Sequence, residues 1–237
     1  ARFAFDLGGE TPETFYMADI QTPEGDAWPA CPRGFAKRAL DALEARHGLR
    51  LKASFEHEFA YTGVEARPNS SYALDGMRRQ QPFAGRYVRA LTAAGVTPEC
   101  VMSEFGPRQY EITVAPTIGV AAADQAVAVR EIARAVAATL DARASFTPIV
   151  DPDGVGNGVH LHFGLVDAET GAAANFDPSA PHRIDRRAGA FVAGVLAKLP
   201  AILALMAPAV ISYLRLQPNR WSATHNNLGV QDREAAV

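Results

Sequence analysis

The chain has 237 residues, a formal net charge of −3 and 48% hydrophobic residues. This length accommodates one large catalytic domain, or one domain and part of another, and the composition is that of a protein with a buried core. Lys and Arg form no dense cluster, which argues against a nucleic-acid partner. Cys31 and Cys100 form no CxxC pair, so we expect neither a disulfide framework nor a cysteine zinc site, and a cytoplasmic location is the simplest interpretation.

The first half of the chain predicts several strands and one helix. The spacing of apolar residues predicts a helix over 33–47, and Gly48 is a natural end for it. Alternating patterns predict strands over 15–20, 54–61, 100–105 and 109–115. The last two are joined by a Gly-Pro-Arg turn, so they are expected to form a hairpin.

The second half predicts two long helices and further short strands. Helices are expected over 120–143 and 186–206, strands over 145–150 and 159–166, and an extended segment over 211–216. Residues 191–213 are apolar enough to span a bilayer, but Lys198 and Pro200 lie in their middle. These two residues favour a buried helix that breaks near Pro200 over a membrane helix. Antiparallel strands segregated from helices indicate an α+β fold.

The strand over 54–61 carries two carboxylates on one face. Side chains alternate along a strand, so Glu56 and Glu58 point the same way and His57 points the other way. Two carboxylates at this spacing repel each other unless a cation or solvent lies between them. The pair therefore indicates either a solvated polar face or half of a metal site.

The predicted hairpin adds two more carboxylates. Glu104 ends the first strand, and Glu111 lies in the second on the face opposite Tyr110 and Ile112. A turn between the two strands brings Glu104 and Glu111 towards one site, although many hairpins carry two glutamates without any such role.

Two histidines follow a glycine-rich run. His160 and His162 share one face of the strand over 159–166, a spacing used both by metal ligands and by hydrogen-bonded core histidines. The run before them reads Gly154-Val155-Gly156-Asn157-Gly158. Its backbone lets a ligand approach closely, but it matches neither the P-loop nor the GxGxxG pattern.

Taken together, four glutamates and two histidines from one strand, the predicted hairpin and a further strand form a candidate metal site. This carboxylate-rich set suits Mg²⁺ or Mn²⁺ better than zinc. Hard cations with open positions are what phosphoryl transfer requires, and Arg215, Arg220 and Arg233 supply further positive charge.

The order of these motifs carries a resemblance. An ExE strand, a pair of glutamates ending in QYEI, a glycine-rich GVHLH, then YLRLQP and DREAAV together resemble the glutamine synthetase family, including its γ-glutamyl-amine ligases. The resemblance implies a catalytic α+β domain with a curved antiparallel sheet and flanking helices. It implies that residues 31–237 form this domain, incomplete at its C-terminal end, and that 1–30 are the tail of an N-terminal β-grasp-like domain.

The resemblance also assigns roles to individual positions. It implies that one metal is held by Glu58, Glu104 and Glu111, and a second by Glu56 and His160. It implies glutamate contacts from Gly156 and Arg215, nucleotide contacts from Glu99 and His162, and contact of Arg233 with the γ-phosphate and the transferred group. In this chain Gly164 replaces a serine that faces ATP in many relatives, and Trp221 replaces the glutamate that ammonia-using relatives place near the amine.

The resemblance implies a cytoplasmic enzyme that assembles as a ring-shaped, dodecamer-like homo-oligomer and has no membrane partner. It joins an amine to the γ-carboxyl of L-glutamate, using ATP and two or three Mg²⁺ or Mn²⁺ ions, through a γ-glutamyl phosphate. The indole of Trp221 accepts no proton but offers an apolar π surface, so an organic amine is expected over ammonia. The alternatives are an ammonia-using glutamine synthetase, a non-catalytic regulatory homologue or another ATP–carboxylate ligase, and Trp221 is equally compatible with simple packing.

Overall fold

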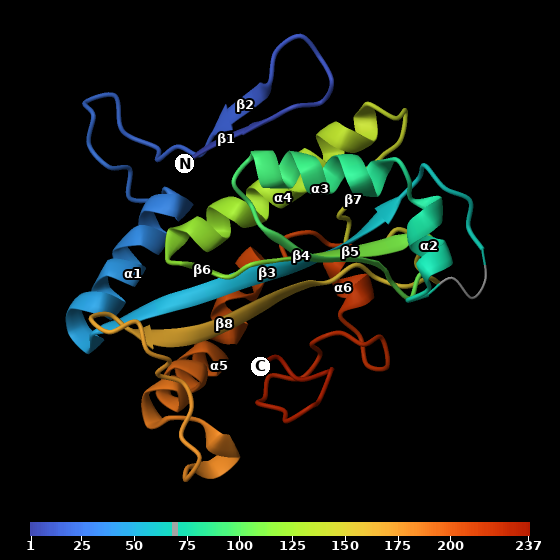
Figure 1. Cartoon of the computed structure of the whole chain (residues 1–237). Helices are drawn as coiled ribbons and strands as arrows, with labels where there is room; N and C mark the ends of the chain where they lie inside the picture. Colours follow the sequence, from blue (N-terminus) through green and yellow to red (C-terminus); the bar gives the residue numbers. More distant parts are fainter. Residues whose placement is uncertain (68–70) are drawn as a thin grey trace.

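The computed structural model describes residues 1–67 and 71–237 and has the expected α+β fold (Figure 1). The strands are β1 (Arg2–Phe5), β2 (Glu13–Tyr16), β3 (Leu49–Tyr61), β4 (Pro98–Ser103), β5 (Gln109–Val114), β6 (Thr117–Ile118), β7 (Ala144–Ser145) and β8 (Val159–Asp167). The helices are α1 (Pro32–His47), α2 (Leu74–Arg79), α3 (Phe83–Ala93), α4 (Val120–Ala138), α5 (Arg186–Met206) and α6 (Ser212–Arg215), with a 3-10 turn at Pro181–Arg183.

The 13-residue strand β3 is the centre of the main sheet. His57 pairs with Ile112 of β5 and also with Val159 of β8, so β5 and β8 lie on opposite edges of β3. The short strands β6 and β7 extend these two edges, and β4 pairs with the outer edge of β5. All of these pairings are antiparallel, which fixes the register of the three strands that carry the candidate site.

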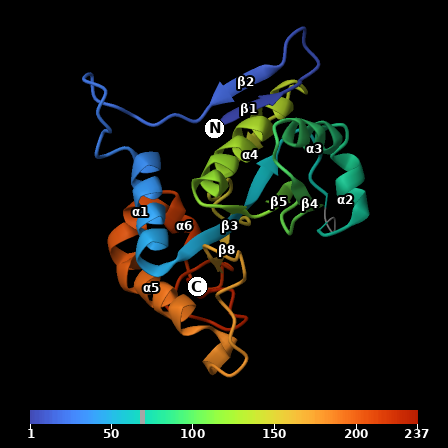
Figure 2. The ribbon, with the colours of Figure 1, turned by 60° about the vertical axis from the view of Figure 1, so that its left-hand side comes forward.

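One face of β3 is buried under α3 and α4 (Figures 1 and 2). Phe59 is fully buried and its ring contacts Phe83, Tyr87 and Phe146 at centroid distances of 5.3–6.3 Å. Burial of large aromatic side chains is the main stabilising contribution of such a core. Because alternate residues of β3 are committed to this core, the intervening residues are directed to the other face.

A smaller apolar cluster packs against the first residues of β3, at the end of the strand away from Phe59. Leu49 and Leu165 are buried together, with Leu43 of α1 and Phe191 of α5 packed against them. Helix α1 ends at Gly48, which has the left-handed conformation expected of a helix-terminating glycine (φ 62°). The chain therefore turns directly from α1 into β3.

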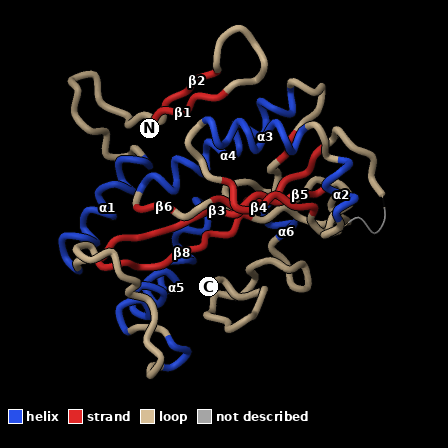
Figure 3. The backbone as a smooth tube through the Cα atoms, viewed as in Figure 1, coloured by secondary structure: helices blue, strands red, loops and turns tan. Residues whose placement is uncertain are grey.

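The N-terminal residues form a separate two-stranded sheet, β1 paired with β2 (Figure 3). The strand predicted over 15–20 is replaced by Glu13–Tyr16, and β1 was not predicted. Phe3, Phe5 and Phe15 of this hairpin pack onto the main core. A two-stranded sheet needs such packing, because alone it is only marginally stable.

Several element predictions between the well-patterned strands were incomplete. Helices α2 and α3 were not predicted, although Phe83, Tyr87 and Leu91 of α3 have helical spacing and are buried. The helix expected over 120–143 ends at Ala138, and the strand expected over 145–150 is reduced to Ala144–Ser145. The segment 211–216 was expected to be extended, which was wrong, because Ser212–Arg215 forms α6.

The prediction of a buried helix broken near Pro200 was also wrong. Helix α5 runs unbroken through Pro200, and of its residues only Ala188 and Val192 are buried. Proline leaves the carbonyl four residues earlier without its helical donor, and the side chain of Asn226 donates to the carbonyl of Leu196 at 3.1 Å. Among the described residues, α5 is the one helix long and apolar enough to cross a membrane.

Candidate active site

Glu56 and Glu58 lie on the face of β3 opposite the aromatic core. The sheet register places His160 of β8 directly across from Glu56, and Glu111 of β5 directly across from Glu58. His162 lies across from Ser54 on the same face. The pairing of three strands thus gathers residues that are about 100 positions apart in sequence. We call these side chains, together with Glu104 described below, the acidic face: Glu56, Glu58, Glu104, Glu111, His160 and His162.

Glu56 forms ion pairs with both histidines. Its Oε1 lies 2.6 Å from His160 Nδ1, and its Oε2 lies 3.2 Å from His162 Nε2. The hydrogen bond with His160 lowers the pKa of Glu56 and raises the pKa of His160. Both histidines are exposed, so the interpretation as a buried core pair is wrong, and both rings are accessible to a ligand.

Glu58 is bound by the glycine-rich segment and by a glutamine that sequence reasoning did not assign. Its Oε2 accepts hydrogen bonds from Gly158 N at 2.8 Å and from Gln109 Nε2 at 3.0 Å. Gln109 Nε2 also lies 2.7 Å from Gly156 O and 2.9 Å from Asn157 Oδ1. Gln109 therefore fixes the glycine-rich segment against β5. The sequence feature that could have identified Gln109 as a site residue is its position on the same strand face as Glu111.

Glu104 and Glu111 complete the acidic face. Glu111 lies opposite Met102 of β4, so Glu104 follows two positions later on the same side. Glu104 Oε2 accepts from Phe105 N at 2.8 Å and from the hydroxyl of Tyr72 at 3.2 Å. The contact with Tyr72 could not be predicted from a local pattern, because Tyr72 comes from the connection before α2.

The pKa of Glu111 shows that the carboxylates of the acidic face lie close to one another. Burial, together with the negative charges of Glu56, Glu104 and Glu58, raises the pKa of Glu111 to about 8. The side chain is 7% exposed. A carboxyl group in this position binds a proton at neutral pH unless another cation is present.

As placed, no three His, Cys, Asp or Glu side chains among residues 1–67 and 71–237 are close enough together to hold a metal ion. Glu56, Glu58 and Glu104 instead pair with a histidine, an amide and a hydroxyl group, and the like charges of the acidic face repel one another. The donor set itself, with four carboxylates and exposed imidazoles, fits a hard divalent cation. The raised pKa of Glu111 is the expected property of a ligand cluster that a cation neutralises.

Arg215 lies directly against the glycine-rich segment. A Cβ atom on Gly156 would lie 2.7 Å from Arg215 Cδ, and one on Gly158 would lie 2.9 Å from Arg215 Nη2. A side chain at either position would displace the arginine, so the two glycines leave the space that Arg215 occupies. Arg215 Nε is buried and has no hydrogen-bond partner among the described residues, so it remains available to an anionic group.

The remaining assigned residues lie around this centre. Trp221 stacks on Phe105 at a ring distance of 6.3 Å, and the guanidinium of Arg233 lies 5.4 Å from the Trp221 ring. Glu99 is exposed near the start of β4, at the end far from Glu104. The structure thus gathers the proposed metal and glutamate ligands, whereas none of the described hydrogen bonds or ion pairs joins Glu99 to them.

Comparison with known proteins decides the family. Residues 29–237 match the family model described as glutamine synthetase, catalytic domain. The chain belongs to the glutamine synthetase family. This family generally uses ATP and divalent metal ions, and the acidic face of this member has the chemistry that such ions require.

The similar proteins include ligases for organic amines. The chain is 38% identical to a gamma-glutamylpolyamine synthetase of Streptomyces coelicolor over 92% of its length, and 28% identical to a gamma-glutamylethanolamide synthetase of the same organism over 93%. A crystal structure of a novel glutamine synthase homolog superposes with a TM-score of 0.92 and 40% identity, covering 99% of this chain and 56% of the other. The chain spans about half the length of the curated relatives it matches, 48% of the first and 50% of the second.

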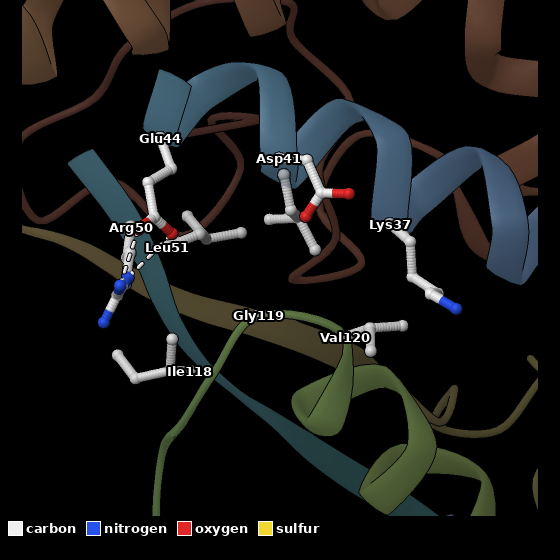
Figure 4. Close-up of a pocket in the computed structure, with 9 residues that line it drawn as sticks. Lys37, Asp41, Glu44, Arg50, Leu51, Ile118, Gly119 and Val120 are labelled. Carbon is white, nitrogen blue, oxygen red and sulfur yellow. Dashed lines mark hydrogen bonds and ion pairs between the residues drawn. The ribbon is translucent and has the colours of Figure 1, made fainter. Parts of the chain in front are cut away.

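This glutamine synthetase-family chain also has a cavity of about 300 Å³ apart from the acidic face (Figure 4). It lies between Lys37, Asp41 and Glu44 of α1 and the start of α4 at Gly119 and Val120. Two of the charged residues there are already paired, since Glu44 is bound to Arg50 at 2.6 Å and Lys37 to Asp19 at 2.7 Å. None of the residues assigned to the acidic face lines this cavity, so we do not assign the chemistry to it.

Proposed function

We propose that the protein to which this chain belongs joins a primary amine to the γ-carboxyl of L-glutamate, using ATP. A carboxylate is a poor electrophile, so ATP first converts it to a γ-glutamyl phosphate, which the amine then attacks with loss of phosphate. The observation that carries the proposal is the acidic face, with Arg215 seated on Gly156 and Gly158, inside a glutamine synthetase catalytic domain.

Divalent cations, Mg²⁺ or Mn²⁺, complete this site in the proposal. Glu58, Glu104 and Glu111 hold one ion, and Glu56 with His160 holds part of a second; the family resemblance implies two or three in all. These ions neutralise the negative charge on the phosphate oxygens during transfer. The carboxylates and imidazoles of the chain position them, and Gln109 keeps Glu58 correctly oriented.

The substrates are held by groups around the acidic face. The guanidinium of Arg215 binds a carboxylate of L-glutamate beside Gly156, because it is half-buried, cationic and has a free Nε. Glu99 and His162 contact the nucleotide, and Arg233 contacts the γ-phosphate and the transferred group. Arg233 is exposed beside Trp221, which leaves its guanidinium open to an anion.

The amine in the proposal is organic. Trp221 occupies the position from which an ammonia-using relative presents a carboxylate, and it offers an exposed aromatic surface instead. Indole cannot take the proton that ammonium and alkylammonium ions alike must lose before attack, so another group serves as the base, and Trp221 favours an organic amine through its apolar π surface. The two Streptomyces relatives, whose names describe polyamine and ethanolamine ligation, support the same conclusion.

The proposal extends to assembly and domains. The whole protein is a cytoplasmic homo-oligomeric ring, dodecamer-like, with no nucleic-acid or membrane partner, and residues 1–30 are the end of an N-terminal β-grasp-like domain. The start of the family match at residue 29 supports this boundary. Sedimentation of the full-length protein tests the ring: a monomer would contradict it.

Hydroxylamine provides the direct test of the chemistry. The full-length enzyme with ATP, Mg²⁺ or Mn²⁺ and glutamate is expected to form γ-glutamyl hydroxamate, because hydroxylamine attacks the acyl phosphate. If neither metal gives hydroxamate and glutamate causes no ATP consumption, the protein is a regulatory homologue. If hydroxamate forms but ammonia is clearly preferred over a panel of organic amines, also after Trp221→Ala, the protein is an ammonia-using glutamine synthetase.

A further inference from the structure

Two large aromatic side chains lie exposed beside the acidic face. Phe105 is 59% exposed and Trp221 is 64% exposed, and their rings stack with an interplanar angle of 27°. They come from distant parts of the chain, the end of β4 and the loop after α6. Two stacked apolar rings left open to solvent mark a surface that binds something.

The backbone of Phe105 fixes this ring relative to the carboxylates. Its N–H donates to Glu104 Oε2 at 2.8 Å, and its carbonyl accepts from the hydroxyl of Ser71 at 2.8 Å. Phe105 therefore binds the proposed metal ligand Glu104 through its main chain, while its side chain is exposed beside the acidic face. Any change of the ring leaves these main-chain contacts in place.

The loop 216–222 holds Trp221 in position from the other side. Arg220 donates to the carbonyls of Pro152 and Gly154 at 2.9 and 3.3 Å, and buried Ser222 donates to the carbonyl of Arg215 at 3.0 Å. Trp221 itself has a left-handed backbone (φ 50°), which is unfavourable for a bulky residue. The surrounding contacts maintain this conformation, as is typical of a residue placed for binding.

A cation already rests on this surface. The guanidinium carbon of Arg233 lies 5.4 Å from the Trp221 ring centroid, within the range of a cation–π interaction. The guanidinium shows that a cationic group fits against the aromatic face of this surface. A positively charged group with an apolar chain is thus able to pack its chain on the two rings and place its charge against their π faces.

We propose that Phe105, stacked on Trp221, determines which amine the enzyme uses, and that this surface takes a primary alkylammonium whose carbon chain packs on the two rings. The inference rests on the proposed function and deepens it. Phe105 selects among amines through its side chain alone, whereas the acidic face performs the chemistry whatever the amine.

The experiment measures kcat/KM of the full-length enzyme for n-butylamine, 1,4-diaminobutane and ammonia. We expect Phe105→Ala to lower the ratio of kcat/KM for n-butylamine over that for ammonia about tenfold, mainly through KM, because the packing contact is present before and during reaction. Phe105→Leu keeps an apolar side chain and loses less. A larger loss for 1,4-diaminobutane than for n-butylamine would show that the second ammonium also uses the ring face, and equal losses would show that chain packing alone selects.

The matched control is Phe35→Ala, which removes an equally exposed phenylalanine (66%) from α1. It is expected to leave all three values unchanged. If wild type forms γ-glutamyl hydroxamate but Phe105→Ala and Phe105→Leu keep the wild-type amine ratios, the inference is overturned and the proposed function stands. If wild type forms no hydroxamate, the proposed function fails and this inference fails with it.

Discussion

The two faces of β3 make opposite contributions to the stability of the fold. On one face Phe59 and His57 are buried against aromatic rings and contribute to stability. On the other face Glu56 and Glu58 lie among like charges, an arrangement that costs stability. The same strand carries both because its side chains alternate. The core face thus offsets the electrostatic cost of the acidic face and keeps its ligands in register.

Replacing Phe59 by Ala should have the largest effect on stability. The ring is fully buried between α3, β5 and Phe146, so its removal leaves a cavity and is expected to cost about 3–5 kcal/mol of unfolding free energy. Urea denaturation of the full-length protein measures this. A loss below about 1 kcal/mol would mean that the core face does not support the strand.

The second prediction concerns His57, whose ring faces Phe146 on the core face. Burial, together with the positive charge of Arg130, lowers its pKa to about 4. The unfolded chain binds a proton below about pH 6.5 and the folded protein does not, so stability falls as the pH drops from 6.5 to 4. We expect His57→Phe to remove up to about 3 kcal/mol of this pH dependence.

Denaturation of both proteins at pH 7 and at pH 4 measures the difference. Other groups titrate equally in wild type and variant, so the comparison isolates His57. Parallel pH profiles for the two proteins would contradict the placement of a neutral histidine in the core.

Replacing Glu111 on the acidic face should stabilise the protein, and the change in unfolding free energy should be smaller than for the core residues. In the metal-free protein the raised pKa of Glu111 means that the folded state keeps a proton that the unfolded chain loses above about pH 4.5. Wild-type stability therefore falls as the pH rises towards 8. Because solvent screens part of the repulsion, we expect Glu111→Gln to stabilise the protein by about 1–2 kcal/mol at pH 8.5 and not at pH 4.

The measurement is again denaturation, without divalent ions and with chelator present. Destabilisation by Glu111→Gln at pH 8.5 would show that Glu111 makes a favourable interaction there, and the contrast between the two faces would be lost.

The sequence was sufficient where a local pattern and the final contacts agree. Strict alternation identified the strand carrying Glu56 and Glu58, and the spacing of His160 and His162 placed both on one face, although it did not decide whether that face is buried or exposed. The family resemblance, based on the order of motifs, was confirmed. The strand faces depend on neighbours two residues apart, and the resemblance depends on the order of short motifs, and sequence shows both directly.

The features that sequence missed depend on distant contacts. Helix α6 ends where the hydroxyl of Ser222 caps the carbonyl of Arg215, and α5 continues through Pro200 where Asn226 supplies the missing donor. The stack of Phe105 on Trp221 likewise joins segments with no shared pattern. Such contacts join residues that are far apart in sequence, so local propensity does not reveal them.

Mn²⁺ binding to the full-length protein, measured by titration calorimetry, tests the central claim that the acidic face is a divalent-metal site. Glu111→Gln removes one charged ligand and should weaken binding at least about tenfold at pH 8.5, although it stabilises the metal-free fold. Glu44→Gln is the matched control, since this carboxylate pairs with Arg50 outside the site, and should bind as wild type. Equal Mn²⁺ affinity of Glu111→Gln and wild type would contradict the account.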